Sequence, residues 1–159
     1  MKERLLRIKN NRKMPLILAF CIPFFLALGV CIGHEIYPFG NQCFLHIDMY
    51  HQYAPFYSEL WHKLRTGDTL LYSWDIGMGV NFTSLFAYYL ASPINWLIAL
   101  LPQKYMIEIM NMLIVMKLCA SSVTFSYYIS KHFHTKKCTI ALFGMFYALS
   151  AYSAAYSWN

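Results

Sequence analysis

Residues 15–33 read PLILAFCIPFFLALGVCIG and contain no charged side chain. At about 1.5 Å of rise per residue, a helix of this length roughly crosses the hydrocarbon core of a bilayer. A basic segment precedes the run, so a cleavable signal peptide is the competing interpretation. The run is longer than such signals need, however, and GHEIYPFG at 33–40 offers no A-x-A-like cleavage site. We therefore expect an uncleaved first membrane span over residues 14–36.

The composition is that of an integral membrane protein. Of 159 residues, 58% are apolar and only 13% are charged, and the mean hydropathy is +0.40. A soluble domain has about half apolar residues and about a quarter charged ones. The five cysteines do not suggest a disulfide framework, because four of them lie in or beside apolar segments. Nothing in the composition indicates a soluble domain.

Two basic clusters set the expected orientation. The net charge is +6, and the Lys and Arg residues concentrate in residues 1–13 and 131–137, beside apolar segments. Such clusters mark the cytoplasmic side of a membrane protein, so we expect no nucleic-acid partner, with attraction of anionic lipids as an added option. Residues 1–13 are then a cytoplasmic tail, and residues 37–105 lie outside the cell.

The external segment is expected to contain a surface helix over residues 55–66. Pro55 suits the first turn of a helix, and Phe56, Leu60 and Leu64 recur at the spacing of one helical face. Gly67 is a plausible stop. The pattern predicts an amphipathic helix that lies on the membrane surface.

Residues 83–101 are apolar but are interrupted by Ser92-Pro93. If they crossed the membrane, the basic loop at 131–137 would lie outside, against the positive-inside rule. We therefore favour an interfacial or re-entrant helix here, followed by spans at 106–130 and 138–157. The predicted fold is all-α, a polytopic transmembrane bundle with amphipathic helices in a large first external loop. We also expect the chain to be the N-terminal piece of a protein that is truncated after residue 159.

Asp48 follows the first span closely and is the candidate catalytic residue. A carboxylate at the membrane surface can act as a general base toward an acceptor hydroxyl, or can hold a divalent cation beside a phosphate. The alternative is that Asp48 caps the helix that follows. His46, Asp48 and His51 could converge on zinc, but surface histidines are common and no zinc motif is present.

Other polar residues have both a functional and an ordinary interpretation. Asp75 lies in the glycine-containing segment WDIGMGVN (74–81), where a backbone can approach a ligand closely, or it is a simple turn residue. Lys117 lies within the predicted span at 106–130, where an ammonium needs a partner: an acid, a lipid phosphate, or a structural ion pair. Near the outer interface, cations could attract a lipid-linked phosphate or could simply be solvated: Lys63, Arg65 and Lys104.

Four stretches resemble the N-terminal part of the bacterial YfhO family of large polytopic membrane proteins. They occur in order along the chain: DMYHQYAPF (48–56), LYSWDIGMGVNF (71–82), FAYYLASPIN (86–95) and AYSWN (155–159). The family is similar to the C-type glycosyltransferases (GT-C fold), which take a sugar from a polyprenyl-phosphate carrier on the outer face of the membrane. The resemblance therefore implies a GT-C-like fold.

The resemblance also implies roles for individual residues. Asp48 becomes the candidate base or metal-linked acid, with Tyr50, Gln52 and Asp75 in the surrounding pocket. Lys104 and Lys117 are further substrate-binding candidates because of their charge and position, and not because of the resemblance. The implied reaction transfers a sugar to a hydroxyl of an envelope polymer of the teichoic-acid type, without a cofactor other than an optional divalent cation. The alternative is a non-enzymatic membrane protein, a flippase for lipid-linked sugars or an envelope assembly partner.

Overall fold

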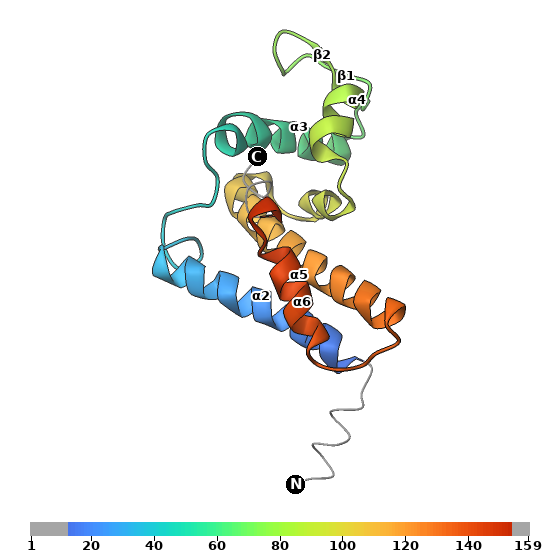
Figure 1. Ribbon diagram of the computed structural model, residues 1–159. Helices are drawn as coiled ribbons and strands as arrows, with labels where there is room; N and C mark the ends of the chain where they lie inside the picture. Colours follow the sequence, from blue (N-terminus) through green and yellow to red (C-terminus); the bar gives the residue numbers. More distant parts are fainter. Residues whose placement is uncertain (1–12, 154–159) are drawn as a thin grey trace. The chain divides into compact units, whose positions relative to one another are not determined.

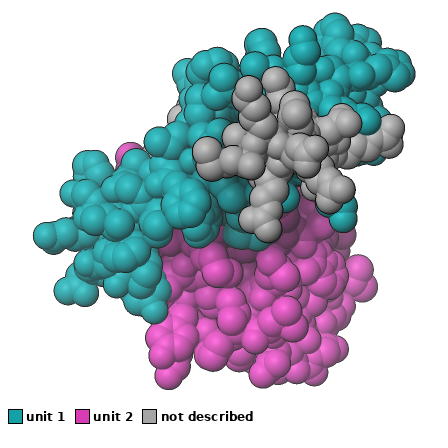
Figure 2. Space-filling view, turned by 90° about the horizontal axis from the view of Figure 1, so that it is seen from below, with its two compact units in different colours: residues 1–42, 114–157 teal, residues 43–113, 158–159 magenta. Residues whose placement is uncertain are grey.

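The computed structural model describes residues 13–153 and is mostly helical (Figure 1). These residues form two compact units, drawn in different colours in Figure 2. Residues 13–42 and 114–153 belong to unit 1, and Cys43–Leu113 make up unit 2. The predictions for residues 1–12 and for the end of the third predicted span, 154–157, lie outside the described residues.

Helix α2, Met14–Gly33, opens unit 1. Pro15 lies in its first turn, where the N–H that proline lacks has no partner within the helix. The helix ends three residues before residue 36, the predicted end of the span, because a Schellman motif stops it. Glu35 has a φ of 52°, and the Ile36 N–H donates to the Cys31 carbonyl at 2.9 Å.

Helix α5, Met106–His132, continues directly from the short 3₁₀ turn η4, Gln103–Tyr105. Its residues from Ile114 onward belong to unit 1. Within the described residues, Met14–Gly33 and Gln103–His132 are the two helices long and apolar enough to cross a membrane. Both coincide with segments for which the sequence predicts a span.

Helix α6, Ile140–Ala148, packs against α2 and approaches α5 closely within unit 1. Gly144 makes this approach possible, because it lies against Ser122 and Ser126 of α5. The Ser126 hydroxyl donates to the Ile140 carbonyl at 3.3 Å. Small residues at such a crossing let two backbones come together, a common device between membrane helices.

Unit 2 is built around helix α3, Ala54–Thr66, which follows a π-helical turn, η1, Met49–Tyr53. Gly67 ends α3 in the left-handed conformation with a φ of 72°, as expected from the sequence. A two-stranded antiparallel hairpin follows, formed by β1, Tyr72–Ser73, and β2, Val80–Asn81. The buried apolar core of this unit includes Tyr57, Leu60, Phe82, Leu85, Leu90 and Ile98.

The segment predicted as one interfacial or re-entrant helix over 83–101 is instead three short pieces. These are α4, Phe82–Leu85, the π-helical turn η2, Phe86–Leu90, and the 3₁₀ helix η3, Pro93–Leu100. The break has a local cause: Ser92 precedes proline and is extended, with a ψ of 129°. None of the three pieces reaches the length of a membrane span.

Replacement of Gly144 by alanine tests the close approach of α5 and α6. A Cβ atom there would collide with the Ser126 hydroxyl and lie 2.5 Å from the Ser122 carbonyl oxygen. We expect Gly144→Ala to lower the free energy of unfolding by about 1–3 kcal/mol, the usual cost of overpacking. Denaturation of the purified protein in detergent micelles measures this change.

The matched control is Gly29→Ala in α2, where an added Cβ meets nothing within 4 Å. Alanine is the better helix former by about 0.5–1 kcal/mol, so this variant should be at least as stable as the wild type. Equal stability of the two variants would contradict the packing described for Gly144.

Candidate functional site

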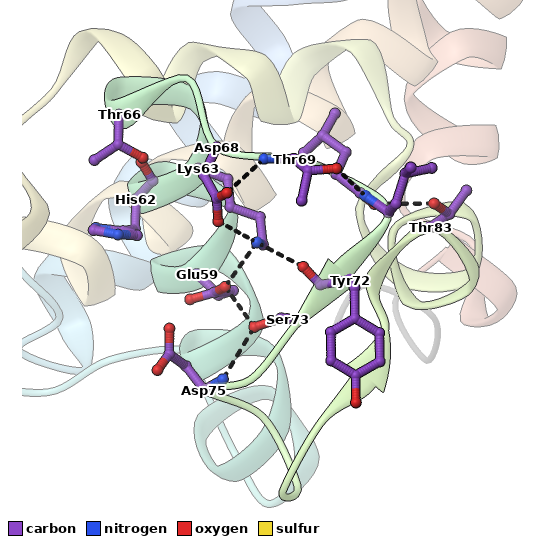
Figure 3. A network of polar contacts seen from close by, with 12 residues as sticks. Glu59, His62, Lys63, Thr66, Asp68, Thr69, Tyr72, Ser73, Asp75 and Thr83 are labelled. Carbon is purple, nitrogen blue, oxygen red and sulfur yellow. Dashed lines mark hydrogen bonds and ion pairs between the residues drawn. The ribbon is translucent and has the colours of Figure 1, made fainter.

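A buried lysine joins the hairpin to helix α3 in unit 2 (Figure 3). The side chain of Lys63 is only 2% exposed, and its ammonium group donates to the Asp68 carboxylate at 2.8 Å and to the Tyr72 carbonyl at 2.9 Å. The Glu59 carboxylate lies 3.4 Å from the same nitrogen. Three oxygens from different parts of the chain therefore meet one cation.

The network extends from Lys63 to the loop of the hairpin. The Ser73 hydroxyl donates to Glu59 at 2.6 Å and accepts the Asp75 N–H at 3.2 Å. The backbone of Asp75 is thus tied through Ser73 and Glu59 to α3. The sequence predicts Lys63 to be an interfacial cation that is either solvated or available to a lipid-linked phosphate. The structure corrects this, because Lys63 is buried and paired.

The charges in this network perturb each other's ionisation. Burial disfavours the ammonium of Lys63, but its hydrogen bonds to Asp68 and Glu59 outweigh the effect of burial and raise the pKa of Lys63. The hydrogen bond from Lys63 and the Thr69 N–H hold the pKa of Asp68 below its ordinary value of 3.8. The contribution of Asp68 to stability is therefore present above pH 3.8 and is lost as the pH falls through its lowered pKa.

A pocket of about 310 Å³ lies beside this network and contains Asp75. Two carboxylates, Asp75 and Glu59, share its lining with the His62 imidazole and the Gln103 amide. The Gln103 amide donates to the Ser58 hydroxyl at 2.6 Å across the same lining. The remaining lining residues are Pro55 and Ile76. We call this the Asp75 pocket.

The hairpin loop brings Asp75 to the pocket through backbone conformations that glycine favours. Gly77 and Gly79 have φ values of 54° and 112°, and Met78 between them has a φ of 62°. A Cβ atom at Gly79 would collide with the Tyr72 hydroxyl. The two glycines that the sequence pointed to are therefore required by the turn.

Asp48 lies in a second cluster of unit 2, at the start of η1. Its side chain is exposed and makes no capping hydrogen bond to the helix, so the structure does not support the alternative interpretation as a cap. Burial raises the pKa of the nearby Tyr53, and the charges of Tyr89, Tyr88 and Asp48 add to this effect. The Asp48 carboxylate is thus close enough to the Tyr53 hydroxyl to influence it.

Aromatic rings form the rest of this second cluster. The rings of Tyr53 and Tyr89 meet edge to face with centroids 4.9 Å apart, Phe56 lies 5.3 Å from Tyr89, and Tyr88 lies 4.5 Å from it. Tyr53 belongs to η1 and Tyr89 to η2, so two π-helical turns meet here. Such turns are rare and are frequent at functional sites. We call Asp48, Tyr53, Phe56, Tyr88 and Tyr89 the Asp48 cluster.

The other predicted site residues are not gathered with these two groups. Tyr50 and Gln52 are exposed on η1, and neither lines the Asp75 pocket. Lys104 is exposed and lies over the Tyr105 ring at 4.7 Å. Lys117 is half-buried on the part of α5 that belongs to unit 1.

Two pocket residues were not expected from the sequence. Glu59 and His62 are three residues apart on α3, a spacing that places them on one helical face. The three-residue spacing of Glu59 and His62 is visible in the sequence. It indicates a shared pocket only once the hairpin loop is known to face this side of α3. Among residues 13–153, no group of three His, Cys, Asp or Glu side chains is arranged to hold a metal ion, which includes His46, Asp48 and His51.

Loss of the Lys63 charge should loosen the hairpin. Lys63→Met keeps most of the aliphatic stem but leaves the buried Glu59 carboxylate without its cation. We expect a loss of local stability of about 1–3 kcal/mol, the cost of an unsatisfied buried polar group. Amide hydrogen exchange of residues 68–82 in the full chain reports it as faster exchange.

Arg65→Met is the matched control, because Arg65 lies on the same helix and is exposed. Exposed substitutions of this kind change stability by only about 0.5 kcal/mol. If both variants left the exchange of residues 68–82 unchanged, the ion network would not hold the hairpin.

A family model described as "Bacterial membrane protein YfhO" matches residues 19–159. No curated protein and no solved structure matches the chain. Roles for single residues of the Asp75 pocket and the Asp48 cluster must therefore be argued from their geometry and chemistry.

Proposed function

The chain belongs to the YfhO family of bacterial membrane proteins, and from this premise we propose that it forms part of an envelope glycosyltransferase. The enzyme takes a sugar from a polyprenyl-phosphate carrier and transfers it to a hydroxyl of an envelope polymer of the teichoic-acid type. The reaction takes place on the outer face of the membrane. Asp48 is its general base.

The proposed step balances with one proton acceptor. The acceptor hydroxyl oxygen bonds to the anomeric carbon of the sugar, and the bond from that carbon to the phosphate oxygen breaks. The hydroxyl proton passes to Asp48, and polyprenyl phosphate leaves with the electron pair. The single observation that carries this role is an exposed carboxylate that is not used as a cap and lies beside a π-helical turn.

The surroundings of Asp48 suit a sugar substrate. Tyr88 is 79% exposed, so its ring can present a flat face to the apolar side of a sugar ring. Tyr50 and Gln52 are exposed on the same π-helical turn as Tyr53 and offer hydroxyl and amide groups for hydrogen bonds.

The Asp75 pocket is proposed to hold a second part of the substrates. Its carboxylates accept hydrogen bonds from sugar or acceptor hydroxyls, and its His62 imidazole can donate or accept one. A divalent cation beside the carrier phosphate remains an optional part of the proposal. Lys104, on the exposed turn η4, is available to attract that phosphate.

The arrangement of charges in unit 1 supports the proposed topology. Lys13 at the start of α2 lines the same cavity as Lys131 and Lys136, which lie at and beyond the end of α5. If residues 83–101 crossed the membrane, these two ends would lie on opposite sides. Their shared cavity supports a cytoplasmic side for both ends, and therefore an external side for residues 37–105.

The test is Asp48→Asn expressed from its own locus in the bacterium. General-base catalysis contributes about 10²–10⁴ to a rate, so we expect the sugar content of isolated envelope polymers to fall to a few per cent or less. Membrane levels of the protein should not change, because Asp48 is exposed and makes no capping bond.

The matched control is Glu35→Gln, which neutralises another exposed carboxylate, just after the end of α2 and next to the proposed external segment. It should leave the sugar content at the wild-type level. Full sugar content in Asp48→Asn would remove Asp48 from the mechanism. If deletion of the whole gene also left the sugar in place, the proposed glycosyltransferase role would be excluded.

A further inference from the structure

A second cavity lies in unit 1, at the end where α2 begins and α5 finishes. It has a volume of about 440 Å³, a size typical of pockets for small ligands. Its walls come from the first turn of α2, the last turns of α5 and the loop that follows α5. The lining residues are Lys13, Leu16, Tyr127, Ser130, Lys131, His134, Thr135 and Lys136. We propose that this cavity binds the phosphodiester headgroup of an anionic membrane lipid.

The charge of the lining selects an anion. Three lysines line the cavity, and no acidic side chain is among the described residues of its wall. The start of α2 adds the positive end of a helix dipole, since Lys13 and Leu16 border both the cavity and the first turn. An ammonium is a compact point charge that suits a phosphate group. Ser130 and Thr135 place hydroxyl groups in the same wall.

Local contacts hold the loop side of the cavity in shape. The Ser130 hydroxyl donates to the Thr135 carbonyl at 2.9 Å, and the Thr135 N–H donates to the Ser130 carbonyl at 3.2 Å. Two hydrogen bonds between the same residues thus close the turn after α5. The Lys131 ammonium lies over the Tyr127 ring, 5.5 Å from its centroid. One of the three cations is therefore positioned by an aromatic side chain of the same wall.

A lipid is the source that fits the place of this cavity. It lies at the ends of the two described helices that are long and apolar enough to cross a membrane. Leu16 and Tyr127 form an apolar part of the wall, and tyrosine is frequent at the depth of lipid headgroups. The cytoplasmic leaflet is rich in anionic lipids, and nearby lysines attract them. A soluble anion would make no favourable contact with the apolar wall formed by Leu16 and Tyr127.

Native mass spectrometry of the full chain in detergent can test the site with phosphatidylglycerol and phosphatidylcholine as probes. The test variant is the double substitution Lys131→Gln/Lys136→Gln. Each basic residue near an anionic surface changes affinity about five-fold, so phosphatidylglycerol should bind about twenty-five-fold more weakly. Phosphatidylcholine should bind weakly to both proteins.

The control removes the same amount of charge outside the cavity. Arg65→Gln/Lys137→Gln also removes two positive charges, and both residues are exposed and lie outside the lining of the cavity. It should retain phosphatidylglycerol like the wild type. Equal loss in both double variants would mean diffuse attraction and would overturn the proposal. Equal binding of both lipids to the wild type would do so as well.

A competition with inorganic phosphate separates the two sources of the anion. If millimolar phosphate leaves phosphatidylglycerol bound, the lipid assignment stands, and if it displaces the lipid completely, the cavity is a site for a soluble anion. The site is independent of sugar transfer, because it contains none of the residues of the Asp48 cluster or the Asp75 pocket. A negative result for lipid binding would not argue against the proposed enzyme, and a negative result for sugar transfer would not argue against the lipid site.

Discussion

The ammonium group of Lys63 is the point on which the order of unit 2 depends. Buried polar groups must find partners, and here one cation satisfies Glu59, Asp68 and the Tyr72 carbonyl together. The ring of Phe82 lies 5.3 Å from the same nitrogen, so the helix after the hairpin is included as well. A short two-stranded hairpin is marginally stable alone. Its attachment to α3 is what gives Asp75 a defined place.

A second constraint acts through the ends of α2 and α5. Both helices have apolar sequences. The basic residues just before α2 and at the end of α5 line one cavity of unit 1. On the proposed topology, the chain returns to the side of the membrane it left without a further described helix of span length. About seventy residues, 34–102, therefore lie between the two helices and can form polar structure outside the spans. An extracytoplasmic site needs such a segment.

Local signals allowed much of the fold to be predicted. Pro55 and Gly67 fix the ends of α3, and Pro93 starts η3, because proline and glycine restrict the backbone independently of tertiary structure. The 3₁₀ and π-helical forms between residues 82 and 100 were not predictable, because packing of the same apolar residues decides among helical forms. The end of α2 at Gly33 was not predicted either, because its Schellman motif has a glutamate, Glu35, at the position where glycine is usual.

The candidate site was predicted only in part, for a related reason. Asp75 was recognised from its glycine neighbours, but its companions Glu59 and His62 lie on a helix more than ten residues earlier. The prediction that Lys63 is an interfacial cation was wrong for the same reason. Periodicity shows which helical face a residue occupies, but it does not show which distant loop covers that face. Asp48 was chosen for its position after the first span. The structure adds Tyr53, whose hydroxyl is near enough to feel the Asp48 charge and whose ring packs against Tyr89.

The central claim is that unit 2 faces the outside while the basic loop after α5 faces the cytoplasm. Labelling of intact cells with a membrane-impermeant maleimide tests it in a variant without native cysteines. A cysteine introduced by Met78→Cys, at a side chain that is 96% exposed, should react in intact cells. One introduced by Lys137→Cys should react only after the cells are permeabilised. The reverse pattern, or reaction of both in intact cells, would contradict the account.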